Sequence, residues 1–468
     1  MKKFSALTML LASSLILCAC TTNGSSNEGP GTSEGNGGLS SEQGGSSQTE
    51  TISFFGWGSA EEQANFQELI NAFMEENPTI KVVYSAASSD SYMTTLKNKG
   101  KNLPDVFYIP DYEFMAWADS GKLLALDEYV TQAEIDSMWD LSTDMYRYDR
   151  DNYKLGTGSL YGLPKDLGPY PLVYNKDLLK AIIQEKGLNL ALPDPTVPMT
   201  WDGFVSYLKQ ITGKHNNKDV FGIGYYEMMA AVYSNNANYF DDEVKKERIS
   251  EKNFIDAIQW IADLDLVHHV APTADQQTSQ NSFQRFLNQG CVFTFMGPWD
   301  CKQFWNDLPF EFDVIPNPVG PAEGAKSTSW VGSVAYSISA NTKKKDAAVK
   351  LAKFLACSER SNKMNYQLGQ AIPNMKEIAL GDYLEGVGLE GRQLMPANRK
   401  LFVDIVQGTE YVQGKNRHRY FVYDNTCLED LEANLTPVWQ GTESAQSFLT
   451  RYASTYQEAL DESNEYLN

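Results

Sequence analysis

The chain has 468 residues, of which 42% are hydrophobic and 12% aromatic, so it is long enough for about two to three domains with large cores. This excludes a small scaffold held together by disulfides and a wholly disordered chain. The 60 Asp and Glu residues against 39 Lys and Arg give a net charge of −21, which makes nucleic acid and anionic membrane surfaces poor partners.

The N-terminal segment predicts where the protein is located. Lys2 and Lys3 precede an uncharged, largely apolar stretch at 4–19, which is shorter than the roughly 20 residues of a membrane-spanning helix. It ends in Leu-Cys-Ala before Cys20, and this sequence resembles a bacterial lipobox. The resemblance implies that residues 1–19 are a lipoprotein signal peptide and that Cys20 carries the lipid. An ordinary cleaved signal peptide with an incidental cysteine is the alternative.

The segment after Cys20 has the composition of a linker. Residues 21–50 contain eight Gly, seven Ser and four Thr, with Glu as the only charged type. Such a composition cannot bury a core, and about 30 residues of it span about 30 Å as a flexible coil. We therefore expect residues 20–50 to form a lipidated cysteine and a flexible Gly/Ser linker, which holds a globular body at the extracellular face of a bacterial cell membrane.

From residue 51 onward, strand and helix patterns alternate. The first elements are a strand at 52–55, an amphipathic helix from 59 to 74, a strand at 80–84 and an apolar run at 104–109. Ser59 and Glu62 fit the capping-box pattern at the start of the helix, and its apolar residues recur about every 3.6 positions. This order indicates a parallel sheet with covering helices, whose ligands bind beyond the carboxyl ends of the strands. Trp57 and Asp111 follow two of those ends.

The same alternation continues through the second half of the chain. Strands are predicted at 172–174, 220–224, 292–295 and 334–339, and helices are predicted from Thr200 onward, through 254–261 and through 347–355. About the last hundred residues are predicted to be mostly helical. The body is therefore expected to be of mixed α/β type.

Several short motifs occur in a characteristic order along the chain. They are the Gly-Trp-Gly turn around Trp57, Pro104-Asp105-Val106, Tyr161-Gly162-Leu163-Pro164 with Tyr174-Asn175-Lys176-Asp177, Thr200-Trp201-Asp202, Gly297-Pro298-Trp299 and Ala340-Asn341. In this order and spacing, over roughly residues 51–375, the chain resembles the extracellular solute-binding proteins of ABC importers, in the carbohydrate-binding group that includes maltose-binding protein. One departure is Cys291, where the family more often has a lysine.

The resemblance implies an α/β, two-lobed periplasmic-binding-protein-like (type II) fold with an interlobe hinge and a cleft. Lobe 1 would comprise 51–166 and 336–390, and lobe 2 would comprise 167–335 and 391–468, with chain crossings near 166–172, near 331–336 and within 385–410. A ligand that touches both lobes stabilises the closed state by its differential contacts. The closed form is then what the membrane permease of the importer recognises.

A pyranose needs aromatic faces against its C–H groups and polar partners for the hydroxyls that lose water. Three tryptophans follow strands at Gly-containing or Ser-rich turns, where a core role is hard to arrange: Trp57, Trp299 and Trp330. The other predicted ligand-binding residues are Asp111 and Asp166, which face the cleft in this family, Tyr170 in the same crossing, and Tyr226 with Glu227 after the strand at 220–224. For the two aspartates, a helix cap or a turn is the alternative role. Carboxylates in the cleft favour a neutral or aminated sugar over a sugar phosphate.

Patterns for catalysis or for a metal are not found. The four histidines lack metal-ligand spacing, and neither a GxSxG motif nor a Walker loop occurs. We therefore predict no catalytic residue, no metal and no cofactor. The body cysteines Cys291, Cys301, Cys357 and Cys427 form no CxxC pattern, and both a disulfide between the first two and free thiols are open.

The sequence thus predicts a monomeric, lipid-anchored receptor that binds a mono- or oligosaccharide and delivers it to the permease of an ABC transporter, without enzyme activity. Nucleic acid is not an expected partner. Three alternatives remain: the same fold binding a non-sugar solute such as a peptide or a polyamine, a surface-anchored glycoside hydrolase, and a sensory co-receptor.

Overall fold

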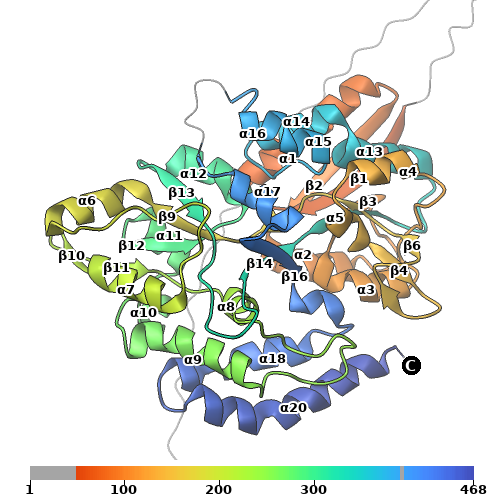
Figure 1. Cartoon of the computed structure of the whole chain (residues 1–468). Coiled ribbons are helices and arrows are strands. Elements are labelled where there is room, and N and C mark those ends of the chain that lie inside the picture. Colours follow the sequence, from red (N-terminus) through yellow and green to blue (C-terminus); the bar gives the residue numbers. More distant parts are fainter. Residues whose placement is uncertain (1–48, 390–394, 468) are drawn as a thin grey trace, which may run out of the picture. The chain divides into compact units, whose positions relative to one another are not determined.

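The computed structural model describes residues 49–389 and 395–467 (Figure 1). The predicted signal peptide at 1–19, the predicted lipid-bearing Cys20 and all but the end of the predicted linker at 20–50 lie outside these residues. Within the described ranges, no helix is both long enough and apolar enough to span a bilayer.

The first five-stranded sheet has the strand order β2-β1-β3-β15-β7. Its strands are β1 (Glu50–Trp57), β2 (Ile80–Ala87), β3 (Val106–Pro110), β15 (Val334–Ile338) and β7 (Leu163–Pro164). β1 pairs in parallel with β2 and β3, as the sequence predicted, whereas β15 runs antiparallel to both β3 and β7. All residues of β3 are buried, which is typical of a central strand that is covered on both faces.

Helices pack against the strands of this first sheet. They include α1 (Ala60–Glu76), α2 (Ser89–Asn98), α3 (Asp111–Asp119) and α13 (Lys345–Cys357), with α14 (Glu359–Gln367) against α1 and α13. α1 begins at the predicted cap, because Ser59 accepts a hydrogen bond from the Glu62 backbone and the Glu62 side chain completes the capping box. Its apolar side, with Phe66, Leu69 and Phe73 fully buried, enters the core of the sheet.

The second five-stranded sheet has the strand order β10-β11-β12-β9-β13. Its strands are β10 (Gly213–His215), β11 (Lys218–Ile223), β12 (Cys291–Phe295), β9 (Leu172–Asn175) and β13 (Phe312–Ile315). β12 is parallel to β11, and β9 is antiparallel to both β12 and β13. This sheet is therefore mixed rather than wholly parallel.

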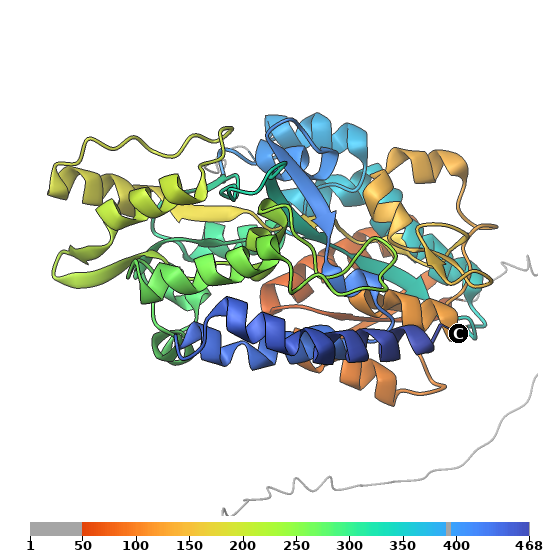
Figure 2. The same ribbon diagram turned by 60° about the horizontal axis from the view of Figure 1, so that its bottom comes forward.

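A second hydrophobic core lies around this sheet. The helices that supply it are α6 (Lys176–Lys186), α7 (Trp201–Ile211), α8 (Met228–Ser234), α9 (Lys252–Leu266), α18 (Thr426–Asn434) and α20 (Ala445–Glu465). α20 packs along α9 and α18 (Figure 2). The C-terminal helices therefore complete the core that the second sheet begins.

A three-stranded sheet, which we call the hinge sheet, connects the two larger sheets. β14 (Ser327–Gly332) pairs in parallel with β16 (Val412–Asn416) and antiparallel with β8 (Gly168–Pro169). β8 lies between β7 and β9 in sequence, and β14 directly precedes β15, so both strands stand on chain connections between the large sheets. Figure 1 shows β14 and β16 between the two groups of strands. A third crossing of the chain between the lobes was predicted within 385–410, and β16 lies just after this range. The predicted boundaries of the two lobes stay predictions.

Shorter elements connect these layers. They are α4 (Gln132–Ser137), α5 (Asp140–Asp144), β4 (Arg147–Asp149), β5 (Lys154–Leu155), β6 (Ser159–Leu160), α10 (Ala274–Ser279), α11 (Ser282–Leu287), η1 (Pro298–Asp300), α12 (Cys301–Asp307), α15 (Lys376–Leu380), α16 (Asp382–Glu385), α17 (Lys400–Gln407), η2 (His418–Phe421) and α19 (Thr436–Trp439). The short 3₁₀ helices η1 and η2 matter for the site, because η1 carries Trp299 and η2 directly follows Arg417.

Candidate ligand-binding site

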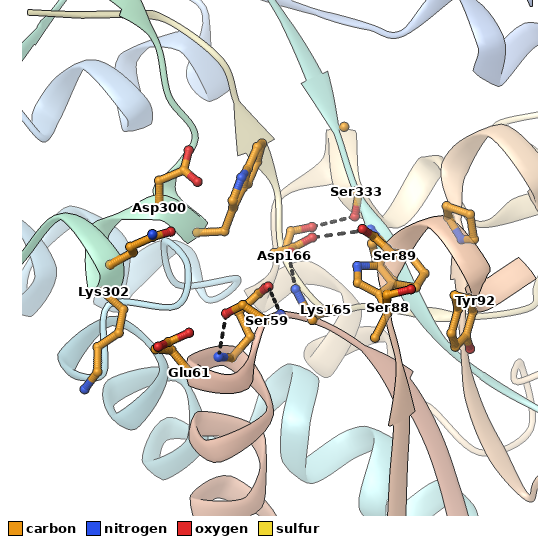
Figure 3. Close-up of a pocket in the computed structure, with 18 of the residues that line it drawn as sticks. Ser59, Glu61, Ser88, Ser89, Tyr92, Lys165, Asp166, Asp300, Lys302 and Ser333 are labelled. Atoms are coloured by element: carbon orange, nitrogen blue, oxygen red, sulfur yellow. Dashed lines mark hydrogen bonds and ion pairs between the residues drawn. The ribbon is translucent and has the colours of Figure 1, made fainter. Parts of the chain in front are cut away.

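A pocket of about 620 Å³, which we call the cleft pocket, is lined by residues of the first large sheet, of the hinge sheet and of the short helices α11, η1 and α12, which flank β12 of the second large sheet in sequence. This volume falls within the usual range of ligand pockets. Its lining includes Trp57, Ser59, Glu61, Glu62, Ser88, Ser89, Tyr92, Tyr112, Lys165, Asp166, Phe283, Trp299, Asp300, Lys302, Gln303, Trp330, Gly332, Ser333 and Arg417. Figure 3 shows Asp300 and Lys302 on one side of the pocket, Ser89 and Tyr92 on the other, and Asp166 between them.

Three aromatic rings stack against one another beside the hinge sheet, and we call them the aromatic platform. The Tyr170 and Trp299 rings are nearly parallel, at 9° with centroids 5.8 Å apart, and the Trp330 ring lies at 24° and 6.2 Å from that of Trp299. Tyr170 and Trp330 are themselves 4.8 Å apart. Trp299 and Trp330 line the cleft pocket, whereas Tyr170 packs against both without lining it. The structure thus brings three of the predicted site residues together.

Trp57 approaches the cleft pocket from the first sheet, at the end of β1. Its ring packs edge-to-face against Tyr92, at 4.8 Å and 68°, and against Tyr108, at 5.2 Å and 85°. These contacts hold the half-buried indole in one orientation while it lines the pocket. Trp57 ends β1 of the first sheet, and Trp299 lies in η1, which follows β12 of the second sheet in the chain. One ligand in this pocket can therefore contact aromatic rings that are attached to both large sheets.

Asp166 lies in the cleft pocket, on the connection between β7 and β8, and is only 6% exposed. Its Oδ2 accepts a hydrogen bond of 2.5 Å from Lys165 Nζ, and its Oδ1 accepts one of 3.3 Å from the Val334 backbone N–H. The Lys165 ammonium also lies over the rings of Phe66 and Tyr108, 5.3 and 5.8 Å from their centroids. A buried cation therefore fixes the carboxylate, and its remaining lone pairs can accept hydrogen bonds from ligand hydroxyls.

Asp111 is fully buried and does not line the cleft pocket. Its carboxylate oxygens accept hydrogen bonds from Arg417, one from Nε at 3.1 Å and one from Nη2. Burial lowers the pKa of Arg417, but attraction by the Asp111 carboxylate outweighs this and holds that pKa above its ordinary value. The guanidinium lies 5.2 Å from the centroid of the Trp330 ring and 5.1 Å from that of Tyr112. Asp111 thus fixes the Arg417 cation, which lines the pocket, whereas Asp111 itself does not reach the pocket.

A second pocket of about 730 Å³, which we call the side pocket, adjoins the cleft pocket, and Tyr112 and Arg417 line both. Its apolar lining includes Tyr226, Met228, Met229, Ile261, Leu264, Leu435 and Trp439, and its polar lining includes Glu227, Asp265, Gln277, Arg419 and Glu432. The side pocket therefore offers a more apolar surface than the cleft pocket, with several polar groups in its lining.

Tyr226 and Glu227 line the side pocket rather than the cleft pocket. Tyr226 is 3% exposed, with its ring edge-on to Trp260 at 4.6 Å and to Phe295 at 5.2 Å, and its hydroxyl has no hydrogen-bond partner among the described residues. Glu227 caps α8, where its Oε2 accepts a 2.6 Å hydrogen bond from the Ala230 N–H. Burial raises the pKa of Glu227 to about 7. Of the predicted residues, the structure thus places four in the cleft pocket and two in the side pocket, while Asp111 and Tyr170 line neither.

Of the charged residues that line the cleft pocket, only Asp166 was predicted from the sequence as a ligand-binding residue; Lys165, Asp300 and Arg417 are among those that were not. Lys165 directly precedes Asp166 and Asp300 directly follows Trp299, so their place in the sequence could have indicated that they lie near the site. Asp300 Oδ2 accepts a 2.9 Å hydrogen bond from the Gly297 N–H, and burial raises the pKa of this carboxyl to about 7. Arg417 is far in sequence from every other residue that lines the cleft pocket, and no local pattern marks it.

The four described cysteines, Cys291, Cys301, Cys357 and Cys427, are free thiols. Of the two possibilities that the sequence left open, the structure therefore favours free thiols over a disulfide. Burial raises the pKa of Cys291 to about 12, so this thiol has little thiolate character. Among the described residues, no group of three or more His, Cys, Asp or Glu is arranged to hold a metal ion.

Residues 57–359 match the family described as bacterial extracellular solute-binding protein. The chain belongs to this family. Its description agrees with the extracellular location that the sequence predicted. A maltotriose-binding protein of Pyrococcus abyssi is 23% identical over 352 residues, which cover 72% of this chain and 71% of that protein.

Two solved structures have the same fold as this chain. An ABC substrate-binding protein from Listeria monocytogenes, in complex with cycloalternan, has a TM-score of 0.74 at 20% identity and covers 88% of this chain and 100% of its own. UgpB from Mycobacterium tuberculosis, in complex with glycerophosphocholine, has a TM-score of 0.70 at 19% identity and covers 88% of this chain and 99% of its own. The predicted α/β, two-lobed fold of the solute-binding proteins is thereby confirmed.

Proposed function

We propose that the protein is a lipid-anchored extracellular receptor that binds a mono- or oligosaccharide and delivers it, unaltered, to the permease of an ABC importer. The observation that carries this proposal is that Trp57, Asp166 and two rings of the aromatic platform, Trp299 and Trp330, line one pocket beside the hinge sheet that connects the two larger sheets. Indole rings offer flat faces to the C–H surface of a pyranose, and a fixed carboxylate accepts hydrogen bonds from its hydroxyls.

The charges around the cleft pocket favour an uncharged ligand. Its charged lining consists of the carboxylates Glu61, Glu62, Asp166 and Asp300 and the cations Lys165, Lys302 and Arg417. Two of these cations are already paired, Lys165 with Asp166 and Arg417 with Asp111. The pocket therefore attracts an anion little, and a neutral or aminated sugar suits its acceptors better than a sugar phosphate does.

The names of similar proteins support a carbohydrate ligand. The Pyrococcus abyssi protein is named for maltotriose, and the Listeria monocytogenes structure holds cycloalternan. We propose for this chain only the class of ligand, carbohydrate. We propose no particular sugar, chain length or linkage. The UgpB structure holds glycerophosphocholine, so the fold alone does not select a sugar.

A binding site between two lobes makes hinge closure the step that prepares delivery. A ligand that contacts both lobes shifts the population toward the closed form by its differential contacts with the two states. We propose that the permease recognises this closed form of a monomeric receptor, which the lipid on Cys20 holds at the outer face of the membrane. In this scheme the protein needs no metal or cofactor, has no catalytic residue and does not bind nucleic acid.

A thermal-shift screen across a panel of saccharides tests the proposal. A ligand at 100 times its Kd stabilises the folded state by about 2.7 kcal/mol, so at least one saccharide should raise the Tm, and chromatography should recover it intact. If a peptide or a polyamine raises the Tm and no saccharide does, the protein is a receptor for that class of solute and not for a sugar. Release of shortened saccharides would instead identify a glycoside hydrolase.

A further inference from the structure

Two glycines stand directly opposite each other in the hinge sheet. Gly168 in β8 pairs with Gly332 in β14 in the antiparallel register. Opposed residues of an antiparallel pair present their side chains on the same face, so a patch of bare backbone lies at this point. Neither glycine has a positive φ angle, so the backbone conformation at both positions suits any L-residue.

Lack of space, rather than backbone conformation, is what excludes a side chain at these two positions. A Cβ atom at Gly168 would overlap with Cζ3 of Trp299. A Cβ atom at Gly332 would lie 2.9 Å from Arg417 Nε and 3.1 Å from Trp330 Cζ3. The bare patch is therefore already covered by two indole rings and a guanidinium, all of which line the cleft pocket.

We propose that Gly168 and Gly332 are positioning residues for the ligand, because they let Trp299 and Arg417 lie directly on the strands of the hinge sheet. The effect on affinity rests on the proposed function. Since the Trp299 ring touches a strand that connects the two lobes, a sugar stacked on this ring is positioned by the hinge itself. Gly297 contributes in the same way, because a Cβ atom there would overlap with the same ring.

Gly414 provides a matched control within the hinge sheet. It lies in β16 opposite Ser329 of β14, and its φ is not positive either. A Cβ atom there would lie 2.6 Å from Val331 Cγ2 and 2.9 Å from the Ile405 backbone oxygen, and neither residue lines the cleft pocket. Gly414→Ala therefore crowds the hinge sheet without touching the aromatic platform.

A double-mutant cycle on thermal stability tests the contact without any ligand. Gly168→Ala should lower the Tm of the mature protein by at least about 2 °C, because the added methyl group strains the Trp299 ring. In a Trp299→Ala background the same change should leave the Tm unaltered, since the ring is gone, whereas Gly414→Ala should lower it equally in both backgrounds.

An equal loss of Tm for Gly168→Ala with and without Trp299 would overturn the proposal. If Gly168→Ala alone prevents folding, the proposal requires that the Trp299→Ala background restores a folded chain. Failure of that rescue would count against it in the same way.

Affinity for a saccharide that stabilises the wild type tests the functional part. Gly168→Ala should weaken binding about tenfold, with no further loss in the Trp299→Ala background, while Gly414→Ala should change it less than about twofold. Equal losses for Gly168→Ala and Gly414→Ala would indicate a general hinge defect and overturn the positioning role. If the wild type binds no saccharide, the proposed function fails, and the stability cycle still decides whether the glycines position the ring.

Discussion

Arg417 and Asp111 form a two-contact ion pair although they are 306 residues apart in the chain. Asp111 begins α3 directly after β3, and Arg417 directly follows the hinge strand β16. The pair therefore fastens the hinge sheet to the first large sheet, and it places the guanidinium where the cleft and side pockets meet. The position of a cleft cation thus depends on a carboxylate that does not line either pocket.

Removing the buried carboxylate of this pair should destabilise the protein strongly. Asp111→Ala leaves the Arg417 cation without its partner in a largely buried place, and we expect a loss of about 3 kcal/mol in the free energy of unfolding, measured with denaturant. The control is Glu243→Ala, which breaks an exposed pair with Lys245 and should leave the free energy of unfolding nearly unchanged. A loss below about 1 kcal/mol for Asp111→Ala would show that the pair is not what fastens the hinge sheet.

The carboxyl of Glu227 should make stability depend on pH. Burial raises its pKa from 4.5 to about 7, so the folded chain holds this proton more tightly than the unfolded chain does. The stability that this proton contributes is fully present below about pH 4.5 and is lost as the pH rises through about 7. Glu227→Gln keeps an acceptor for the Ala230 N–H. The difference in Tm between this variant and the wild type should therefore be more in favour of the variant at about pH 8 than at about pH 4.5.

The measurement for Glu227 is the Tm of wild type and variant across that pH range. Glu243→Gln, at an exposed position, is the control and should follow the wild-type curve. If the Tm of Glu227→Gln and the Tm of the wild type change with pH in parallel, the Glu227 carboxyl does not titrate between about pH 4.5 and 8.

The tryptophans of the cleft pocket should contribute to affinity and to stability in different proportions. Trp57→Ala and Trp299→Ala should each weaken saccharide binding about tenfold with little loss of stability, because both indoles are half-buried and line the pocket. Trp330→Ala should weaken binding and also cost about 3 kcal/mol of stability, since this side chain is only 9% exposed.

Titration calorimetry and denaturant unfolding separate these two effects. Trp139→Phe serves as the control, because it removes a 3.0 Å hydrogen bond from the indole to the Pro373 carbonyl outside the pocket and should change stability alone. Unchanged affinity in all three pocket variants would refute the stacking role.

The predicted lipid anchor can be tested in cells with two neighbouring cysteines. Cys20→Ser should release the protein from the membrane fraction, because serine provides no thiol for lipid attachment. Cys18→Ser is the matched control, since Cys18 would leave with the signal peptide, and this variant should stay in the membrane fraction. Full membrane retention of Cys20→Ser would contradict the lipobox interpretation.

Much of the fold could be predicted because its signals are local. The capping box at Ser59 and the apolar stripe after it were sufficient to predict α1, and the alternation at 80–84 falls within β2. β16, by contrast, lies in a region predicted to be mostly helical. Its residues Val412–Asn416 form a strand because they pair with β14, about 85 residues earlier in the chain, and no local pattern reports that pairing.

The candidate site was harder to predict because tertiary contacts decide which side chains reach a pocket. Trp57 and Trp299 follow strands at glycine turns, and both line the cleft pocket. Asp111 also follows a strand, but its carboxylate forms a buried ion pair with Arg417 and does not line the cleft pocket. Tyr226 was expected beside the ligand, yet its ring is packed among other aromatic rings, and it lines the side pocket rather than the cleft pocket.

We propose that two lobes close around a sugar and release it unchanged. Small-angle X-ray scattering of the mature protein, with and without a saccharide that raises its Tm, tests this most directly. We predict that the radius of gyration falls on saturation, recovers after dialysis, and that the dialysed sugar is intact. An unchanged radius with every saccharide, together with tight binding and compaction by a chemically unrelated solute, would contradict the account.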